Sequence, residues 1–161
     1  MKRERTFSWE NPMEGAKEAI HMSGMEYLQA MSDHKFPLPP FLYTLDFTVT
    51  KVKSGNIVFE FVPQEFHYNP IGTVHGGVIT SILDSAMGCS VHSLLPVGKG
   101  YTTLELKINF LKAVTIKTGK LKTLSKVINL GGRTALVEAQ LIDENNIIYA
   151  HALSTCLIIN Y

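Results

Sequence analysis

The segment from Val78 to Leu95 constrains the fold of this chain most, because it is apolar on nearly every side. It is too long for one strand, and a helix that is hydrophobic all round has to be buried. One charge interrupts it, since Asp84 is the only Asp, Glu, Lys or Arg between Glu65 and Lys99. The fold must therefore enclose this helix and also accommodate a carboxylate in its middle.

The flanking segments predict a sheet around this helix. Residues 41–51 and 56–62 are rich in β-branched and aromatic types and flank Ser54-Gly55, which predicts a hairpin. Residues 101–110 alternate polar and apolar, with Thr103 on the polar side, as in a strand with one face in water. Three further strands are predicted over 116–129, 133–143 and 146–159. This order predicts an α+β fold in which a curved, mostly antiparallel sheet wraps around one long apolar helix.

An extra helix is predicted at the N-terminus. Residues 12–32 carry apolar side chains at roughly helical spacing, which predicts one amphipathic helix. The sequence Phe36-Pro-Leu-Pro-Pro40 ends it, because proline disfavours helix for itself and for the residue before it. We therefore divide the 161 residues into a helical extension over 1–36 and one main domain over 37–161.

Composition excludes several classes of protein. Fifteen Lys and Arg balance 14 Asp and Glu, without the basic excess of a general nucleic-acid binder. Two cysteines make no disulfide framework and favour a reduced, cytoplasmic location. The polar residues within 78–95 argue against a membrane span, and the six histidines lack the spacing of metal ligands. We expect a cytoplasmic protein with no nucleic-acid, membrane or metal partner.

Asp84 is the first candidate catalytic residue. A buried carboxylate without a partner destabilises a fold by on the order of several kcal/mol, so a chain keeps one when something satisfies it or when chemistry needs it. Burial also makes a carboxylate a stronger base. The alternative is a structural carboxylate that caps nearby backbone or pairs with a histidine.

The sequence His75-Gly76-Gly77 is the second candidate, because it stands where the apolar helix begins. The first turn of a helix has unpaired N–H donors and a positive dipole end, which suit a carbonyl oxygen that becomes an oxyanion. The alternative is a tight turn that needs glycine for its backbone angles.

The spacing of the two candidates adds a constraint. Gly76 and Asp84 are eight residues apart, about 12 Å along a helix. Groups that act on one carbonyl should lie within ~3 Å of the reacting atoms. One helix cannot easily supply both, whereas two antiparallel helices across a two-fold axis could. We therefore predict a site between two subunits, with two sites per dimer.

The motif Asn69-Pro-Ile-Gly-Thr-Val-His-Gly-Gly77, followed by Leu83-Asp84, resembles the signature of hotdog-fold thioesterases of the phenylacetic-acid-degradation type. Pro37-Leu-Pro-Pro40 and Gly100-Tyr-Thr-Thr-Leu-Glu-Leu-Lys107 fit the bacterial branch, so the resemblance spans about residues 37–158. It implies the hotdog fold, hydrolysis of acyl-coenzyme A, and a homodimer that commonly pairs into a homotetramer. Coenzyme A would be part of the substrate, and no separate cofactor is expected.

The resemblance also implies roles for the matched residues. Asp84 would be the general base or the nucleophile, and the Gly76 N–H would polarise the thioester carbonyl. Asn69 would position the attacking water, His75 would lie beside the thioester, and Thr103 would lie near the water. The residues alone do not decide between activation of water by Asp84 and its direct attack to form an anhydride.

Coenzyme A has a weaker predicted site. Gly77 beside Gly76 and the segment Leu130-Gly-Gly-Arg133, with Gly131 and Gly132 before Arg133, are the candidates. An arginine fork matches phosphate, and glycine permits close approach. The alternative for residues 130–133 is an ordinary hairpin turn with an exposed arginine.

Two other functions remain open at this point. One is an acyl-coenzyme A hydratase or dehydratase of the hotdog type, and the other is a non-catalytic sensor of acyl-coenzyme A. The acyl group is also open, because aryl, hydroxyaryl and medium-chain groups are all compatible with the sequence. Five aromatic residues are assigned to the core, although some of them could line an acyl pocket: Phe41, Tyr43, Phe47, Phe59 and Phe61.

Overall fold

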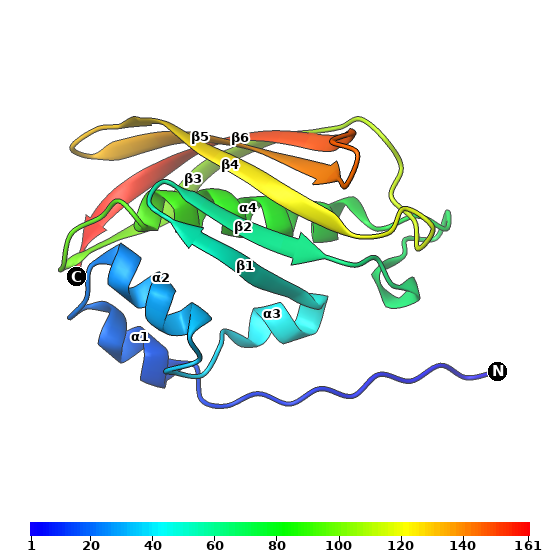
Figure 1. Ribbon diagram of the computed structural model, residues 1–161, viewed down its shortest axis with the longest axis horizontal. Coiled ribbons are helices and arrows are strands. Elements are labelled where there is room, and N and C mark those ends of the chain that lie inside the picture. The colour runs from blue at the N-terminus through cyan, green and yellow to red at the C-terminus, as the bar shows by residue number, and fades with distance from the viewer.

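The computed structural model describes residues 1–161 and shows a six-stranded antiparallel sheet curved around one long helix, α4 (Gly76–His92; Figure 1). The predicted α+β fold with one enclosed helix is confirmed. The strand order is β1-β2-β4-β5-β6-β3, so β1 and β3 are the two edges. The other elements are α1 (Met13–Ala19), α2 (Gly24–Ser32), α3 (Pro40–Leu45), β1 (Phe47–Lys53), β2 (Asn56–Phe61), the short 3-10 helix η1 (Glu65–His67), β3 (Lys99–Phe110), β4 (Leu121–Leu130), β5 (Thr134–Asp143) and β6 (Ile148–Asn160).

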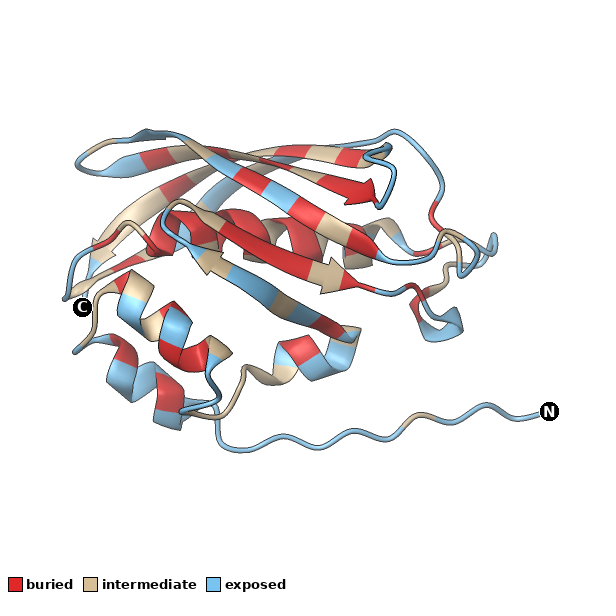
Figure 2. Cartoon of the chain, in the orientation of Figure 1, coloured by how far each residue is buried: buried red, intermediate tan, exposed pale blue.

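Helix α4 forms the centre of the core, as its apolar sequence predicts. It packs against strands β2 to β6, and most of its residues are buried (Figure 2). Each fully buried large apolar side chain stabilises the fold by about 1.5–3 kcal/mol. The apolar α4 side chains with no exposed surface are Ile82, Leu83, Ala86, Met87 and Val91. No helix is long and apolar enough to cross a membrane.

The N-terminal extension holds two helices, so the prediction of one helix over residues 12–32 was wrong. The chain turns between α1 and α2, and Ser23 starts α2 with a reciprocal capping box to Glu26. Gly24 then lies directly on the end of α4, where a Cβ would come within 1.7 Å of the His92 carbonyl oxygen. Its N–H donates to the Leu95 carbonyl (3.0 Å). The helix predicted over residues 12–32 is therefore interrupted, because α2 has to begin in contact with the end of α4.

Helix α3 replaces the start of a predicted strand. We expected a strand over residues 41–51, but β1 begins at Phe47. Pro40 occupies the first turn of α3, where its missing N–H has no consequence, and Asp46 ends the helix in the left-handed conformation (φ 55°). Likewise, the strand predicted over 116–129 begins only at Leu121.

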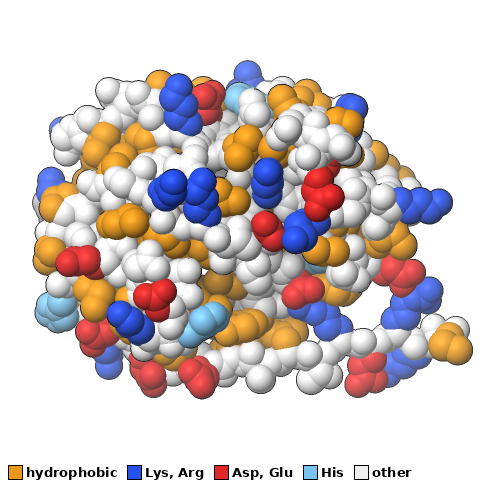
Figure 3. Space-filling view, in the orientation of Figure 1, with side chains coloured by type: hydrophobic (Ala, Val, Ile, Leu, Met, Phe, Trp, Pro, Cys, Tyr) orange, Lys and Arg blue, Asp and Glu red, His pale blue; other side chains and the backbone are white.

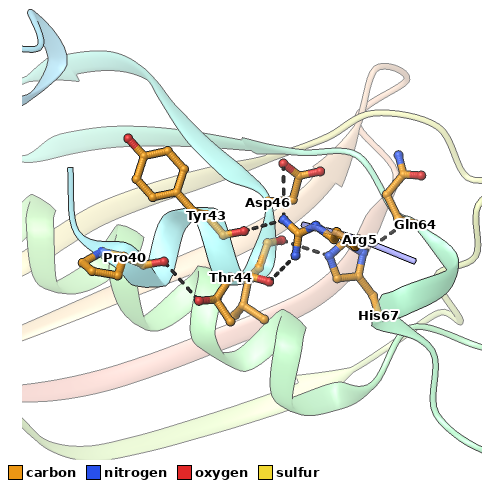
Figure 4. A network of polar contacts seen from close by, with 8 residues as sticks. Arg5, Pro40, Tyr43, Thr44, Asp46, Gln64 and His67 are labelled. Carbon is orange, nitrogen blue, oxygen red and sulfur yellow. Dashed lines mark hydrogen bonds and ion pairs between the residues drawn. The ribbon is translucent and has the colours of Figure 1, made fainter. Parts of the chain in front are cut away.

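An extended N-terminal arm ties α3 to the body of the molecule. Arg5 donates to the carbonyl oxygens of Tyr43 and Thr44 at the end of α3, the latter at 2.7 Å (Figure 4). Its guanidinium also lies 3.9 Å from the Asp46 carboxylate and over the Phe66 ring, 4.1 Å from its centroid. A cation at this helix end satisfies free carbonyls and complements the dipole.

Strand β3 contains a β-bulge that the alternating sequence conceals. Thr103 pairs with Cys156 of β6, and Leu104 is the extra residue before the ladder resumes. The bulge turns Thr103 onto the inner face of the sheet, together with Leu106 and Ile108, which pack on the core. The prediction that Thr103 lies on the polar, water-facing side was therefore wrong.

The surface carries charges of both signs. In the view of Figure 3, Lys and Arg are interspersed with Asp and Glu, in keeping with a net charge of +1. The face shown in Figure 3 carries no large patch of charge of a single sign.

Candidate active site

Asp84 and Thr103 lie together across the interface of α4 with β3. The Thr103 hydroxyl donates to Oδ1 of Asp84 at 2.9 Å. Asp84 is half-buried rather than enclosed, and no cation pairs with it. The expectation of a buried carboxylate is met only in part, because one side of α4 remains partly open. Gly77, Ser81 and Asp84 follow one another along that side at i, i+4 and i+7.

The start of α4 presents one free N–H donor. His75 is the N-cap, and its Nδ1 accepts the N–H of Gly77 at 2.8 Å. No acceptor in the chain takes the N–H of Gly76. His75 therefore engages one glycine donor and leaves the other available. Because its N–H is engaged, Gly77 cannot offer that group to a ligand in this conformation.

Gly76 lies in a cleft of about 290 Å³ that Asn69 also lines. The ring of Phe110 covers the glycine, and a Cβ at Gly76 would come within 3.0 Å of Phe110 Cζ. The absence of a side chain thus keeps the donor accessible beneath an aromatic ring.

Asn69 has a structural role that the sequence analysis missed. Its Oδ1 accepts from the N–H groups of Ile71 (3.1 Å) and Thr73 (3.2 Å), and its Nδ2 donates to Thr73 Oγ1 (2.9 Å). These bonds close the loop before α4, as asparagine does in an Asx turn. The Asn-Pro-x-Gly sequence, which is typical of a turn, could have predicted this structural role. One amide hydrogen of Asn69 remains for another partner, and its action on a water molecule stays a prediction.

The predicted residues thus form two separate groups within one chain. Asp84 is hydrogen-bonded to Thr103, and Asn69 lines the same cleft as Gly76. The helix between Gly76 and Asp84 is continuous, so the two groups lie about 12 Å apart along its axis. The cleft at Gly76 does not include Asp84.

A sequence model described as the thioesterase superfamily matches residues 71–150, which contain Gly76, Asp84 and Thr103 but not Asn69. The chain belongs to the thioesterase superfamily. An Archaeoglobus fulgidus protein named as a candidate esterase is 27% identical over 135 residues, covering 84% of this chain and 85% of its own.

Solved structures show the same fold. A phenylacetic acid degradation-related protein of Ralstonia eutropha JMP134 is 25% identical, with a TM-score of 0.72 over 80% of this thioesterase chain and 97% of its own. The PaaI protein of the Escherichia coli phenylacetic acid degradation operon is 17% identical, with a TM-score of 0.73 over 88% and 96%. The resemblance to hotdog-fold thioesterases of this type is confirmed.

The predicted coenzyme A segment of this thioesterase is the turn between β4 and β5. The Gly131 N–H donates to the Thr134 carbonyl at 2.8 Å, and the Arg133 carbonyl accepts from Ile158 N–H at 2.9 Å. Arg133 is exposed and forms no ion pair. Neither Gly131 nor Gly132 has a positive φ. A left-handed turn therefore does not explain these glycines, and their contact with coenzyme A stays a prediction.

Cys89 on α4 lies near Asp84 but is not a suitable nucleophile. Burial raises the pKa of the Cys89 thiol to about 12, so the reactive thiolate is scarce near neutral pH. No three His, Cys, Asp or Glu side chains are grouped so that they could hold a metal ion.

An apolar cavity of about 340 Å³, which the sequence did not predict, lies between the N-terminal helices and α4. Phe41 and Phe59, which we assigned to the core, are on its wall. No local sequence signal shows this cavity, because its walls come from six helices and strands that meet only in the folded chain.

Proposed function

We propose that this thioesterase hydrolyses acyl-coenzyme A to a free acid and coenzyme A, in a site shared by two copies of the chain. The hydrogen bond between Thr103 and Asp84 carries the proposal. It fixes a carboxylate that no cation neutralises, on the partly open side of α4. A fixed, unpaired carboxylate beside the substrate is suited to take a proton from water.

The proposed reaction begins with water attacking the carbonyl carbon while Asp84 takes its proton. The carbonyl electrons move to oxygen, and the resulting oxyanion accepts the N–H of the partner subunit's Gly76. The intermediate then collapses, the carbon–sulfur bond breaks, and sulfur leaves with the bonding electrons. The proton on Asp84 passes to this thiolate, which gives the free acid and coenzyme A.

A covalent variant of this reaction gives the same products from the same reactants. Asp84 attacks the carbonyl carbon, the thiolate leaves, and water hydrolyses the anhydride. Label that appears in the Asp84 carboxylate after a single turnover in heavy-oxygen water would support the covalent route, because activation of water by Asp84 leaves that carboxylate unlabelled.

Strand β3 supports the shared site. It is a twelve-residue edge strand on which Leu104 (57%) and Phe110 (52%) remain exposed. A long unpaired edge is a template for another strand. Pairing of two β3 strands about a two-fold axis would set two α4 helices antiparallel and bring one Gly76 toward the other Asp84. We propose such a homodimer, with two dimers forming a homotetramer.

The other predicted residues complete the proposal. Asn69 would hold the attacking water with its remaining amide hydrogen, and His75 would lie beside the thioester. Gly77 would leave room for the pantetheine chain. Arg133, which has no partner in the chain, would bind a phosphate of coenzyme A, with Gly131 and Gly132 giving space for its approach.

The test is thiol release from a panel of aryl, hydroxyaryl and medium-chain acyl-coenzyme A thioesters. Asp84→Asn keeps the shape and an acceptor for Thr103 but removes the base, so we expect kcat to fall by about 10²–10⁴-fold. Asp33→Asn, an exposed carboxylate at the end of α2, is the matched control. Full activity of Asp84→Asn would refute the assignment. Hydration of an enoyl thioester without thiol release would favour a hydratase instead.

A further inference from the structure

The apolar cavity of about 340 Å³ lies under the N-terminal helices. Helices α1, α2 and α3 lie beside the α4 and β1 region (Figure 1), and they form the outer wall with residues that include Tyr27 and Phe41. Helix α4 contributes Ser85, Cys89 and His92 to the opposite wall. No charged side chain lines the cavity, which is the usual character of a pocket for an apolar ligand.

The cavity begins beside the proposed catalytic carboxylate. Ser85 directly follows Asp84, and Cys89 and His92 continue along the same side of α4 at i+4 and i+7. The cavity therefore follows α4 from Ser85, the neighbour of Asp84, toward the C-terminal end of the helix, and Asp84 itself is not on its wall. His92 is eight residues beyond Asp84, about 12 Å along the helix axis.

His92 supplies a polar group to this apolar cavity. The residue is only 5% exposed, and its Nδ1 is the one buried side-chain polar atom in the chain that has no hydrogen-bond partner. Its ring lies between Tyr27 and Tyr101, with centroids 5.8 and 5.7 Å away. Gly24 packs against the same residue. Since buried polar atoms are nearly always bonded, this nitrogen lacks a partner that the chain itself does not supply.

We infer that the cavity binds the acyl group of the substrate, and that this group is of medium length with a hydroxyl near its far end that hydrogen-bonds to His92. The inference rests on the proposed function. Three bonds of an extended chain span about 3.6 Å, so a chain that covers the roughly 12 Å of axial rise from Asp84 to His92 has at most about ten bonds between its carbonyl carbon and its hydroxyl oxygen.

The chemistry of the cavity selects a neutral hydroxyl over a charged group. Burial lowers the pKa of His92, so its ring is neutral and offers one donor and one acceptor. A hydroxyl matches either nitrogen. A second carboxylate would enter a cavity without a cation, which is unfavourable.

The experiment compares kcat/KM for decanoyl-, omega-hydroxydecanoyl- and para-hydroxyphenylacetyl-coenzyme A. We expect the native chain to prefer the omega-hydroxydecanoyl substrate over decanoyl by about tenfold, the value of one hydrogen bond. His92→Phe should bring that ratio to about one, His92→Gln should keep part of it, and His21→Phe, an exposed control, should leave it unchanged. An equal ratio in the native chain and His92→Phe, or the arylacetyl substrate as the best, would overturn the inference.

Two further measurements separate failure of the inference from misfolding or from failure of the proposed function. His92→Phe removes an unpaired polar atom, so its Tm should be no lower than that of the native chain. Binding of free omega-hydroxydecanoate to Asp84→Asn protein, read as a rise in Tm above that given by decanoate, needs no turnover.

If no thioester is hydrolysed but this rise appears and His92→Phe removes it, the proposed function fails and the cavity assignment stands. If decanoyl-coenzyme A is hydrolysed but neither the preference nor the rise appears, the cavity assignment fails alone.

Discussion

The hydroxyl of Thr103 donates a hydrogen bond of 2.9 Å to Oδ1 of Asp84, and the bulge at Leu104 makes this contact possible. In a regular strand the side chains point alternately to the two faces of the sheet. If β3 had no bulge and Leu106 still pointed inward, the Thr103 side chain would point outward. The catalytic geometry we propose therefore depends on one extra residue in an edge strand.

We predict that Thr103→Val lowers kcat by about 10–100-fold with little change in KM. Valine has nearly the same shape as threonine, but it removes a hydrogen bond to a charged group, worth about 1.5–3 kcal/mol. Thr103→Ser keeps the hydroxyl and should retain most of the activity. Steady-state thiol release gives both constants. Equal loss in the valine and serine variants would show that the methyl group, and not the hydroxyl, matters.

The sequence was sufficient to predict the enclosed helix and the position of Asp84 on it, because burial on all sides and one isolated charge are local patterns. It placed Thr103 on the wrong face, because a bulge shifts the phase of a strand without changing its composition. The break between α1 and α2 was missed because its cause is the contact of Gly24 with His92, 68 positions later in the chain.

The cavity could not be predicted for the same reason. His92 becomes unusual only when its ring is enclosed without a partner, and that depends on Tyr27 and Tyr101 from other elements. In the sequence it is one of six histidines. Local patterns therefore predict elements and isolated charges, whereas cavities and unpaired atoms follow from contacts between distant segments.

We predict that Gly76→Pro abolishes most activity while the protein stays folded. Gly76 is the first residue of α4, where proline is favoured, and His75 already has the extended conformation that precedes proline (φ −60°, ψ 134°). The change removes a free N–H, and loss of one oxyanion donor lowers kcat by about 10²–10³-fold. Gly76→Ala keeps the N–H, and its Cβ meets only the tip of the exposed Phe110 ring, so it controls for bulk. Circular dichroism and thiol release measure both properties.

Mixing Asp84→Asn with Gly76→Pro tests whether the site is shared between subunits. Each variant alone lacks one group in every site. A mixed dimer would hold one complete site and one with both changes, so random exchange should restore about a quarter of the native activity. Exchange can be verified by native mass spectrometry. Proven mixed dimers without restored activity would show that Gly76 and Asp84 act within one chain.

The stability of the protein should fall as the pH drops below about 6.5, the ordinary pKa of histidine. Burial lowers the pKa of both His67 and His92 in the folded chain. The unfolded chain therefore binds protons that the folded chain does not, and this shifts the equilibrium toward unfolding. His67 must also keep Nδ1 free of a proton to accept the Gln64 N–H at 2.9 Å. Each group contributes up to about 1.4 kcal/mol per pH unit.

The matched variant for this pH dependence is His92→Phe, which removes one of the two groups. Urea unfolding between pH 7.5 and pH 5.5, values chosen about one unit either side of the ordinary histidine pKa, should give a shallower loss of the free energy of unfolding in this variant than in the native chain. If the free energy of unfolding falls equally with pH in the two proteins, the prediction for His92 is contradicted and the prediction for His67 still stands.

Arg5 should stabilise the fold far more than its neighbour Arg3, although both are basic residues of the same arm. Arg5 donates to the Thr44 carbonyl at 2.7 Å and to the Tyr43 carbonyl, and it lies over the Phe66 ring. Arg3 pairs only with an exposed Glu65, and such surface pairs contribute about 0–1 kcal/mol.

We therefore expect Arg5→Gln to lower the free energy of unfolding by about 1–2 kcal/mol, since it loses charge-assisted bonds to the end of α3. Arg3→Gln should change it little. Urea midpoints measure the difference, and amide exchange should show faster opening of α3 in the Arg5 variant alone, because its last turn loses its cap. Helix α3 carries Phe41 and Leu42 on the wall of the acyl cavity, so the same variant should weaken binding of omega-hydroxydecanoate. Equal midpoints for the two variants would show that the arm does not hold α3 in place.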